Sequence, residues 1–252
     1  MNESIKSSVI YPTLSVIILL SAWEATIRFS GWSEQVFPGP IIVFKAFFEL
    51  VADGTLFNHS VASLYRVTVG FYLAAILGIP LGILLGLHRI SHSMVNPIVQ
   101  FLRPISPLAW IPLAMLWFGI GDNPAIFLIF LSSFFSLIVA SAIAVHSINP
   151  IYFQVAANFN FTRRELITKV VVPAIVPNVV TALRLTIAVA WLVVVAAEMI
   201  AVQSGLGYLI LDSRNALRMD YVMVGMIVIG FIGLFLDLIM QKLSIQEWTT
   251  GH

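Results

Sequence analysis

The sequence predicts an all-α integral membrane protein with about six transmembrane helices, an external interfacial helix and a cytoplasmic helix-turn-helix. Of its 252 residues, 60% are hydrophobic and 10% are charged, whereas soluble domains carry about 25% charged residues. Six apolar stretches exceed the ~18 residues that a membrane span requires. They cover residues 9–28, 60–87, 94–118, 124–147, 174–201 and 220–243. Membrane lipid is therefore an expected partner, and a formal net charge of +1 gives no reason to expect nucleic acid.

The first stretch, 9–28, is interpreted as a retained span rather than a secretory signal. It is long for the apolar part of a signal, contains Pro12 and Glu24, and lacks a cleavage site of the small-x-small kind. Residues 1–37 are thus expected to form an N-terminal transmembrane helix with an external loop.

Residues 38–53 have the pattern of an amphipathic helix lying in the external membrane interface. Apolar side chains such as Phe44 and Phe48 alternate at helical spacing with Lys45 and Glu49, and the segment is too short to cross. Residues 54–243 then form the core transmembrane domain, and residues 244–252 form a cytoplasmic tail.

The second span carries small residues at every fourth position. Such a stripe lets another helix approach closely, which is the main way in which helices associate inside a bilayer. The partner helix lies in this chain or in a second copy. The stripe consists of Gly70, Ala74, Gly78, Gly82 and Gly86.

The third span is interrupted by four prolines: Pro97, Pro104, Pro107 and Pro112. A broken helix at membrane depth is tolerated against protein or beside a water-filled cavity. Two interpretations stay open, because the stretch either lines a pathway or is a packed helix that the prolines kink. Residues of this stretch that are candidates for the pathway are Arg103, Pro107 and Trp110.

Residues 149–173 are the longest polar interval between spans and predict two short helices. Asn149 can cap the first helix, Asn160 suits the left-handed turn that ends it, and Thr162 with Glu165 forms a capping box for a second helix that Pro173 ends. The first helix should present one apolar face, made of Tyr152, Val155, Ala156 and Phe159. Neither helix is long enough to cross, so both should lie on the surface, where another protein can bind them.

The distribution of basic residues orients the chain. With both termini in the cytoplasm, more lysines and arginines fall inside than outside. The 149–173 interval is then cytoplasmic.

Glu198 is the most isolated acid in the apolar sequence, near the outer end of the fifth span. Acids at such positions usually face a bundle interior or a water path. Three interpretations of Glu198 stay open: a structural partner or hinge at the pathway, direct contact with substrate or a gate, or simple placement at the interface. Glu198 and its neighbour Met199 are therefore candidates for the pathway or its gate. Arg184 lies too far along the same helix to pair with Glu198 and is expected to extend toward the cytoplasmic surface. Arg66 and Arg103 could attract anions, although their proximity to span ends favours the same snorkelling.

Catalytic and metal chemistry find no support in the sequence. His88 and His92 have the spacing of two metal ligands but no nearby acid or cysteine completes a site, so no metal or cofactor is expected on this chain. Hydrolase and phosphate-loop motifs are missing. The chain is therefore expected to be no enzyme, and uphill transport would need an ion gradient or another subunit.

The interval from Gln154 to Pro173 resembles the cytoplasmic coupling loop of ATP-binding-cassette importer permeases. The family pattern is E-A-A, three residues, G, nine residues, I-x-L-P, and this chain meets every spacing. Gln154-Val155-Ala156 stands for E-A-A, Asn160 for the glycine, Val170 for the isoleucine and Val172-Pro173 for L-P. The resemblance implies that the loop contacts an ATPase through Tyr152, Gln154, Val155, Ala156, Phe159, Asn160, Thr162, Arg163, Glu165 and Pro173.

Residues 38–243 are similar to the subfamily that imports taurine, aliphatic sulfonates, nitrate or bicarbonate. The resemblance implies a type I importer transmembrane domain in a bacterial inner membrane, working as a homodimer with two cytoplasmic ATPase subunits and an external substrate-binding protein. ATP and Mg would be held by the ATPases. The alternative interpretations are a self-sufficient secondary carrier or channel, and an assembly scaffold that conducts nothing.

Overall fold

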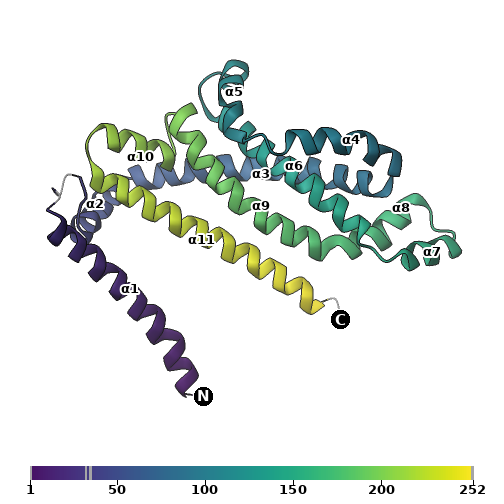
Figure 1. Cartoon of the computed structure of the whole chain (residues 1–252), viewed down its shortest axis with the longest axis horizontal. Helices are drawn as coiled ribbons and strands as arrows, with labels where there is room; N and C mark the ends of the chain where they lie inside the picture. Colours follow the sequence, from purple (N-terminus) through teal and green to yellow (C-terminus); the bar gives the residue numbers. More distant parts are fainter. Residues whose placement is uncertain (1, 32, 34–35, 251–252) are drawn as a thin grey trace.

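The structure is a computed structural model that describes residues 2–31, 33 and 36–250. The side chains of residues 2–9, 12, 30, 89–93 and 243–250 lie outside that description. Within the described residues every regular element is helical (Figure 1). The elements are α1 (Asn2–Ser30), α2 (Pro40–Ala52), α3 (Thr55–Leu87), α4 (Arg89–Leu102), the 3-10 helix η1 (Pro107–Trp110), α5 (Ile111–Phe118), α6 (Asp122–His146), α7 (Pro150–Asn158), α8 (Arg163–Glu165), the π-helix η2 (Leu166–Val171), α9 (Val172–Ala201), α10 (Leu206–Asn215) and α11 (Met219–Thr250).

Helices α3 and α6 pack side by side and run parallel. A Cβ added at Gly70 would lie 2.8 Å from the Cβ of Ile129, and one added at Gly86 would lie 2.6 Å from the Cβ of Val145. Residue numbers therefore rise together along both helices. The small-residue stripe of α3 lies on this contact, so its partner is α6 of the same chain. The buried members are Gly70, Ala74, Gly78 and Gly82.

The parallel arrangement fixes the role of the segment between these helices. Because α3 ends at one side of the bundle and α6 begins at the other, residues 88–121 must return across it. The return is made by two pieces, Met94–Leu102 and Pro107–Phe118, which are bent by 88° relative to each other. The third predicted stretch is thus a broken span, and the interpretation as a single kinked helix is wrong.

Only some of the prolines in this stretch make the break. Pro97 lies inside α4, and Pro112 lies in the first turn of α5, where a missing N–H costs nothing. The helix ends at residues 103–106, around Pro104, and restarts at Pro107.

Four further segments are long and apolar enough to cross a membrane: Thr55–Leu87, Asp122–His146, Arg163–Ala201 and Met219–Lys242. The broken pair makes a fifth crossing. The predicted N-terminal span, 9–28, lies in α1, which extends away from the bundle and contacts it near α2 (Figure 1). Its exposed side chains from Val16 to Leu20 are apolar, and its role as a span stays a prediction.

The second helix of the 149–173 interval does not end at Pro173, contrary to the sequence-based expectation. Helix α8, the π-helix η2 and α9 form one continuous helical segment, Arg163–Ala201, of 39 residues. In a π-helix the backbone hydrogen bonds join residues five apart instead of four. The wider turn directly before Pro173 therefore accommodates a residue that has no N–H to donate. The interval is therefore one short helix, a turn, and the first turns of the fifth span.

Helix α11 lies antiparallel to α9, on the side of α6 and α9 opposite the α4–α5 pair (Figure 1). The Trp191 indole donates to the backbone carbonyl of Ile229 at 3.0 Å. Arg184 forms two hydrogen bonds with the carboxylate of Asp237, at 2.7 and 2.8 Å. Arg184 therefore pairs with an acid on α11, and its extension toward the cytoplasmic surface stays a prediction.

Candidate functional site

A buried ion-pair hub joins three helices at the end of the bundle where α3 and α6 begin. The Arg66 guanidinium of α3 lies 2.6 Å from Glu198 of α9 and 2.7 Å from Asp122 at the start of α6. Arg66 is 1% exposed and Glu198 is fully buried. Snorkelling, which the sequence favoured for Arg66, is therefore wrong: the side chain is enclosed by acids that the fold brings to it.

The Glu198 carboxylate is satisfied by donors from two directions. The Ser63 hydroxyl donates at 2.8 Å and the backbone N–H of Gly207 at 3.0 Å, in addition to Arg66. A buried carboxylate is stable only when paired and hydrogen-bonded in this way. Substrate has no access to Glu198 in this conformation, and the neighbouring Met199 is half-buried.

The turn between α9 and α10 is built around the same hub. The N–H of Gly205 donates to Nδ1 of His59 at 2.9 Å, and the N–H of Leu206 donates to the Ser63 hydroxyl at 2.9 Å. Arg66 donates to the Ser204 carbonyl at 2.8 Å. Gly205 has φ +100, and any Cβ there would collide with the Glu198 carboxylate.

The sequence contained a signal for this hub. His59, Ser63 and Arg66 recur at i, i+4 and i+7 along an otherwise apolar span, which places three polar side chains on one helix face. Such a polar face inside a membrane helix predicts an internal partner.

The second candidate feature is the break between α4 and η1. Arg103 and Pro107 line a cavity of about 170 Å³ together with Ser132 and Ser136 of α6. Trp110 is half-buried and packs against the main hydrophobic core instead. The pathway candidates therefore lie in two places. Arg103 and Pro107 line this cavity, whereas Glu198 belongs to the hub and Met199 is its neighbour in the chain.

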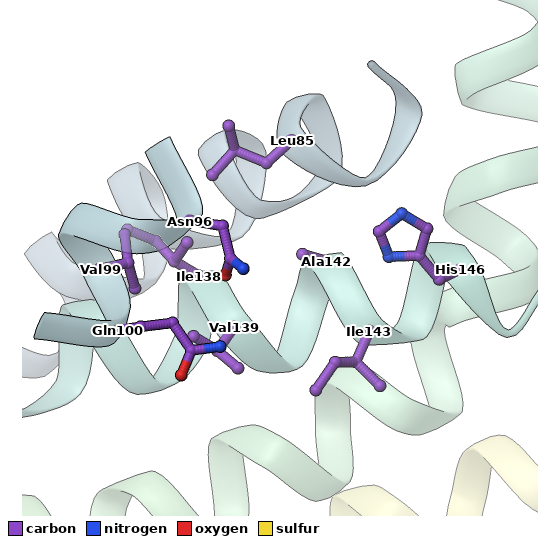
Figure 2. A pocket seen from close by; sticks show the side chains of 9 residues that line it. All are labelled: Leu85, Asn96, Val99, Gln100, Ile138, Val139, Ala142, Ile143 and His146. Atoms are coloured by element: carbon purple, nitrogen blue, oxygen red, sulfur yellow. The ribbon is translucent and has the colours of Figure 1, made fainter. Parts of the chain in front are cut away.

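A second, separate cavity of about 220 Å³ lies between α4 and the half of α6 that ends at the 149–173 interval. Figure 2 shows Asn96 and Gln100 reaching from α4 toward α6, where Val139 and His146 lie. Together with Arg103 these two side chains recur at i, i+4 and i+7 along one face of the chain.

The third feature is the 149–173 interval, whose local chemistry follows the sequence-based expectation. The Asn149 side chain accepts from the N–H of Ile151 at 3.0 Å, and Asn160 has φ 53. Thr162 and Glu165 form the reciprocal capping box, with bonds of 3.3 and 3.0 Å. Buried residues at the end of α6 and in η2 and α9 anchor the interval to the bundle: Ala144, Val145, Ile148, Val171 and Ile175.

The exposed apolar side chains of α7 form a stripe that we call the α7 stripe: Ile151, Tyr152, Val155 and Phe159. Phe159, just after the helix, is 72% exposed. Ala156, which the sequence placed on the same face, is buried at 3% exposure. Its backbone carbonyl also accepts from the N–H of Phe161, so Ala156 belongs to the inner side of the turn. Gln154, Arg163 and Arg164 are exposed beside the stripe.

Comparison with known proteins agrees with this arrangement. Residues 78–244, which contain the broken span, the 149–173 interval and Glu198, match the family described as "Binding-protein-dependent transport system inner membrane component". The chain belongs to this family of permeases. It is thus a multi-pass inner-membrane subunit of an ATP-binding-cassette importer, a family whose permeases work with ATPase and substrate-binding partners.

Relatives share most of this permease's length. It is 32% identical to the taurine transport system permease protein TauC of Escherichia coli over 95% of this chain and 90% of that protein. It is 34% identical to the bicarbonate transport system permease protein CmpB of Synechococcus elongatus over 95% of this chain and 89% of that protein.

Solved structures show the fold. An inward-facing structure of the MetNI methionine ABC transporter superposes with a TM-score of 0.66 and 18% sequence identity, covering 79% of this permease and 97% of that chain. The architecture is therefore that of a type I importer transmembrane domain.

A polar cluster on the surface of the permease links α2 to the start of α11. Arg218 contacts Glu49 at 3.2 Å and Asp220 at 2.8 Å, and the Tyr221 hydroxyl donates to Glu49 at 3.0 Å. The hydrogen bond to Asp220 raises the pKa of Arg218 further above its already high value. Helix α2 is thus linked to the start of α11 by these exposed contacts, in addition to the burial of Val43, Ala46 and Leu50 in the hydrophobic core.

No metal centre accompanies these features in the described part of the chain, where no three His, Cys, Asp or Glu side chains gather. The side chain of His92 lies outside the described residues.

Proposed function

We propose that this permease imports a small oxyanion, such as taurine or another sulfonate, nitrate or bicarbonate. A substrate-binding protein outside the membrane delivers the solute, and two cytoplasmic ATPase subunits that hold ATP and Mg drive a homodimer of the permease. The observation that carries the proposal is the exposed α7 stripe, which is presented at one end of the bundle by a chain without a nucleotide-binding motif of its own. The similarity to taurine and bicarbonate permeases supports the solute class.

In this proposal the ATPase binds the α7 stripe. Tyr152, Val155 and Phe159 offer the large apolar and aromatic side chains that dominate the binding energy of protein interfaces. The basic residues Arg163 and Arg164 beside them favour a cytoplasmic position, with both termini on that side.

The fold offers a route from the ATPase to the external end. From Arg163 onward the 149–173 interval continues into α9, so a displacement of this interval moves a helical segment of 39 residues. Its far end carries Glu198, where α3, α6 and α10 meet. We infer that the hub, with Glu198 and Met199, responds to closure of the ATPases and controls access from outside.

The test is reconstitution in liposomes with radiolabelled taurine and bicarbonate as probes. The permease together with its ATPase and binding protein is expected to accumulate at least one of these anions only when ATP is present on the ATPase side. Omitting any one of the three components should abolish uptake. Uptake by the permease alone, without ATP, would contradict the proposal and identify a self-sufficient carrier or channel.

A further inference from the structure

The break in the third span places one arginine at an unexpected depth. Arg103 follows α4 directly and lines the cavity of about 170 Å³ with Ser132 and Ser136. These serines lie near the middle of α6, which extends from Asp122 to His146. Arg103 thus sits at about half the height of a membrane helix, rather than near a span end as its place in the sequence suggested.

The charge of Arg103 has no counter-ion in the described part of the chain. Each ion pair found there involves other residues, and no carboxylate lines the cavity. The hydroxyls of Ser132 and Ser136 donate to backbone carbonyls of their own helix at 2.8 and 3.1 Å. The guanidinium donors of Arg103 are therefore the free hydrogen-bonding groups of this cavity.

Exposure of this charge to lipid is unfavourable. The hydrocarbon layer is about 30 Å thick, so a side chain at mid-height must reach about 15 Å to a headgroup, which is beyond an arginine. Arginines at such depth face a bundle interior or water. The side chain is exposed in the single subunit, so a water-filled path accounts best for it.

The rest of α4 supports a path on this side. Asn96 and Gln100 continue the polar face from Arg103 toward the cytoplasmic end of α6, beside the cavity shown in Figure 2. A polar face that extends about 10 Å along the helix, a third of the hydrocarbon thickness of about 30 Å, has no use against lipid. It suits the wall of an aqueous route.

We propose that Arg103 is the anion-attracting residue of the translocation path. It lies halfway across the membrane, at a position that Ser132 and Ser136 also line. This inference rests on the proposed import of an oxyanion and names the group in the permease that would recognise it. A lone arginine attracts an anion but does not surround it with the further donors that would bind it tightly. Weak attraction of this kind suits a translocation path, because a solute must leave the site as readily as it enters.

The natural absence of cysteine makes a direct test available, since a single introduced thiol reports on its surroundings. The variant Ser132→Cys, in membranes that contain the permease with its ATPase and binding protein, is treated with an anionic sulfonatoethyl and a cationic trimethylammonioethyl methanethiosulfonate. The anionic reagent is expected to react faster. Adding Arg103→Gln should lower the ratio of the two rates about tenfold or more, while Arg103→Lys should keep most of it.

Two control thiols bracket the measurement. Leu234→Cys, on an exposed apolar side of α11, should react with neither reagent, and Ala216→Cys, in the external turn after α10, should react with both at a ratio that Arg103→Gln leaves unchanged. An unchanged ratio at Ser132→Cys in the Arg103→Gln background would overturn the inference. A thiol at Ser132→Cys that reacts with neither reagent would overturn it as well, because the cavity beside Arg103 would then contain no water.

The labelling is independent of the proposed function. If the complete complex shows no ATP-dependent uptake of taurine or bicarbonate, the proposed function fails, whereas the labelling ratio still reports the charge of Arg103. If uptake is ATP-dependent and Arg103→Gln retains the wild-type rate for both probes, the inference fails alone.

Discussion

At the scale of single residues, the chain contains arginines in three different electrostatic settings. Arg66 is buried between Glu198 and Asp122, Arg184 is half-exposed against Asp237, and Arg103 faces its cavity without an acid. Removing one partner of a buried pair leaves an uncompensated charge, whereas an exposed pair is screened by solvent. The same residue type therefore contributes to stability in one place and is available for recognition in another.

Glu198→Gln should reduce both stability and coupled transport. Breaking a buried ion pair typically costs about 3–5 kcal/mol, and Asp122 compensates Arg66 in part. A lower thermal midpoint in detergent and a loss of substrate-stimulated ATP hydrolysis are expected. Asp237→Asn removes the matched half-exposed pair with Arg184 and should have the smaller effect on both measurements. Equal shifts in the two variants would argue against the hub as a special structure.

At the scale of elements, the contact between α3 and α6 is set by the absence of side chains. A Cβ at Gly82 would lie 2.5 Å from the carbonyl oxygen of Ile138 and 2.6 Å from the Cβ of Ser141. Dispersion and close backbone approach hold such helices together inside a bilayer, so any added atom separates them. The broken span depends on this pair, because α4 and α5 pack along α6.

Gly82→Ala is therefore expected to destabilise the permease by about 1–3 kcal/mol, the usual cost of overpacking a close contact. The control is Gly230→Ala in α11, where an added Cβ meets nothing within 4 Å. That change should be neutral or gain up to about 1 kcal/mol through helix propensity. Thermal unfolding of the two variants in the same detergent checks the difference, and a stable Gly82→Ala variant would refute the tight contact.

At the scale of the whole molecule, the 149–173 interval and the hub lie at opposite ends of one helical segment, Arg163–Ala201. The π-helical turn lets that segment pass Pro173 without stopping, so the part of the 149–173 interval from Arg163 onward is continuous with the fifth span, and α7 joins it through the turn at Asn160. A partner that grips the α7 stripe can in this way act on helices that meet at the opposite side of the membrane.

Phe159→Asp should release the ATPase from the permease. A charge on the α7 stripe replaces an exposed aromatic side chain, and loss of such an anchor costs about 2 kcal/mol or more, roughly 30-fold in affinity. Co-purification of the ATPase with the tagged permease measures it. Ala157→Asp adds the same charge to the far side of α7, two residues from Val155, and should leave binding nearly unchanged. Retained binding in Phe159→Asp would place the contact elsewhere. Ala156→Asp tests folding instead, because Ala156 is buried.

The sequence by itself determined what depends on near neighbours in the chain. Hydropathy identified four helices that are long and apolar enough to cross a membrane and the broken pair. The caps at Asn149 and Thr162 and the turn at Asn160 were predictable because their partners lie within three residues. The spacing of the same interval indicated the family of the permease. The small-residue stripe predicted a close helix contact but left its partner open.

Only the tertiary structure decided which distant groups meet. Arg66 finds Asp122 and Glu198 at separations of 56 and 132 residues, which no local pattern encodes. The depth of Arg103 depends on where the broken span folds back along α6, and the exclusion of Ala156 from the exposed face depends on what packs beneath α7. The continuation past Pro173 likewise required the π-helical turn, whose wider ladder no propensity of the single residues predicts. Helical periodicity shows which side chains share a face, whereas packing determines what that face meets.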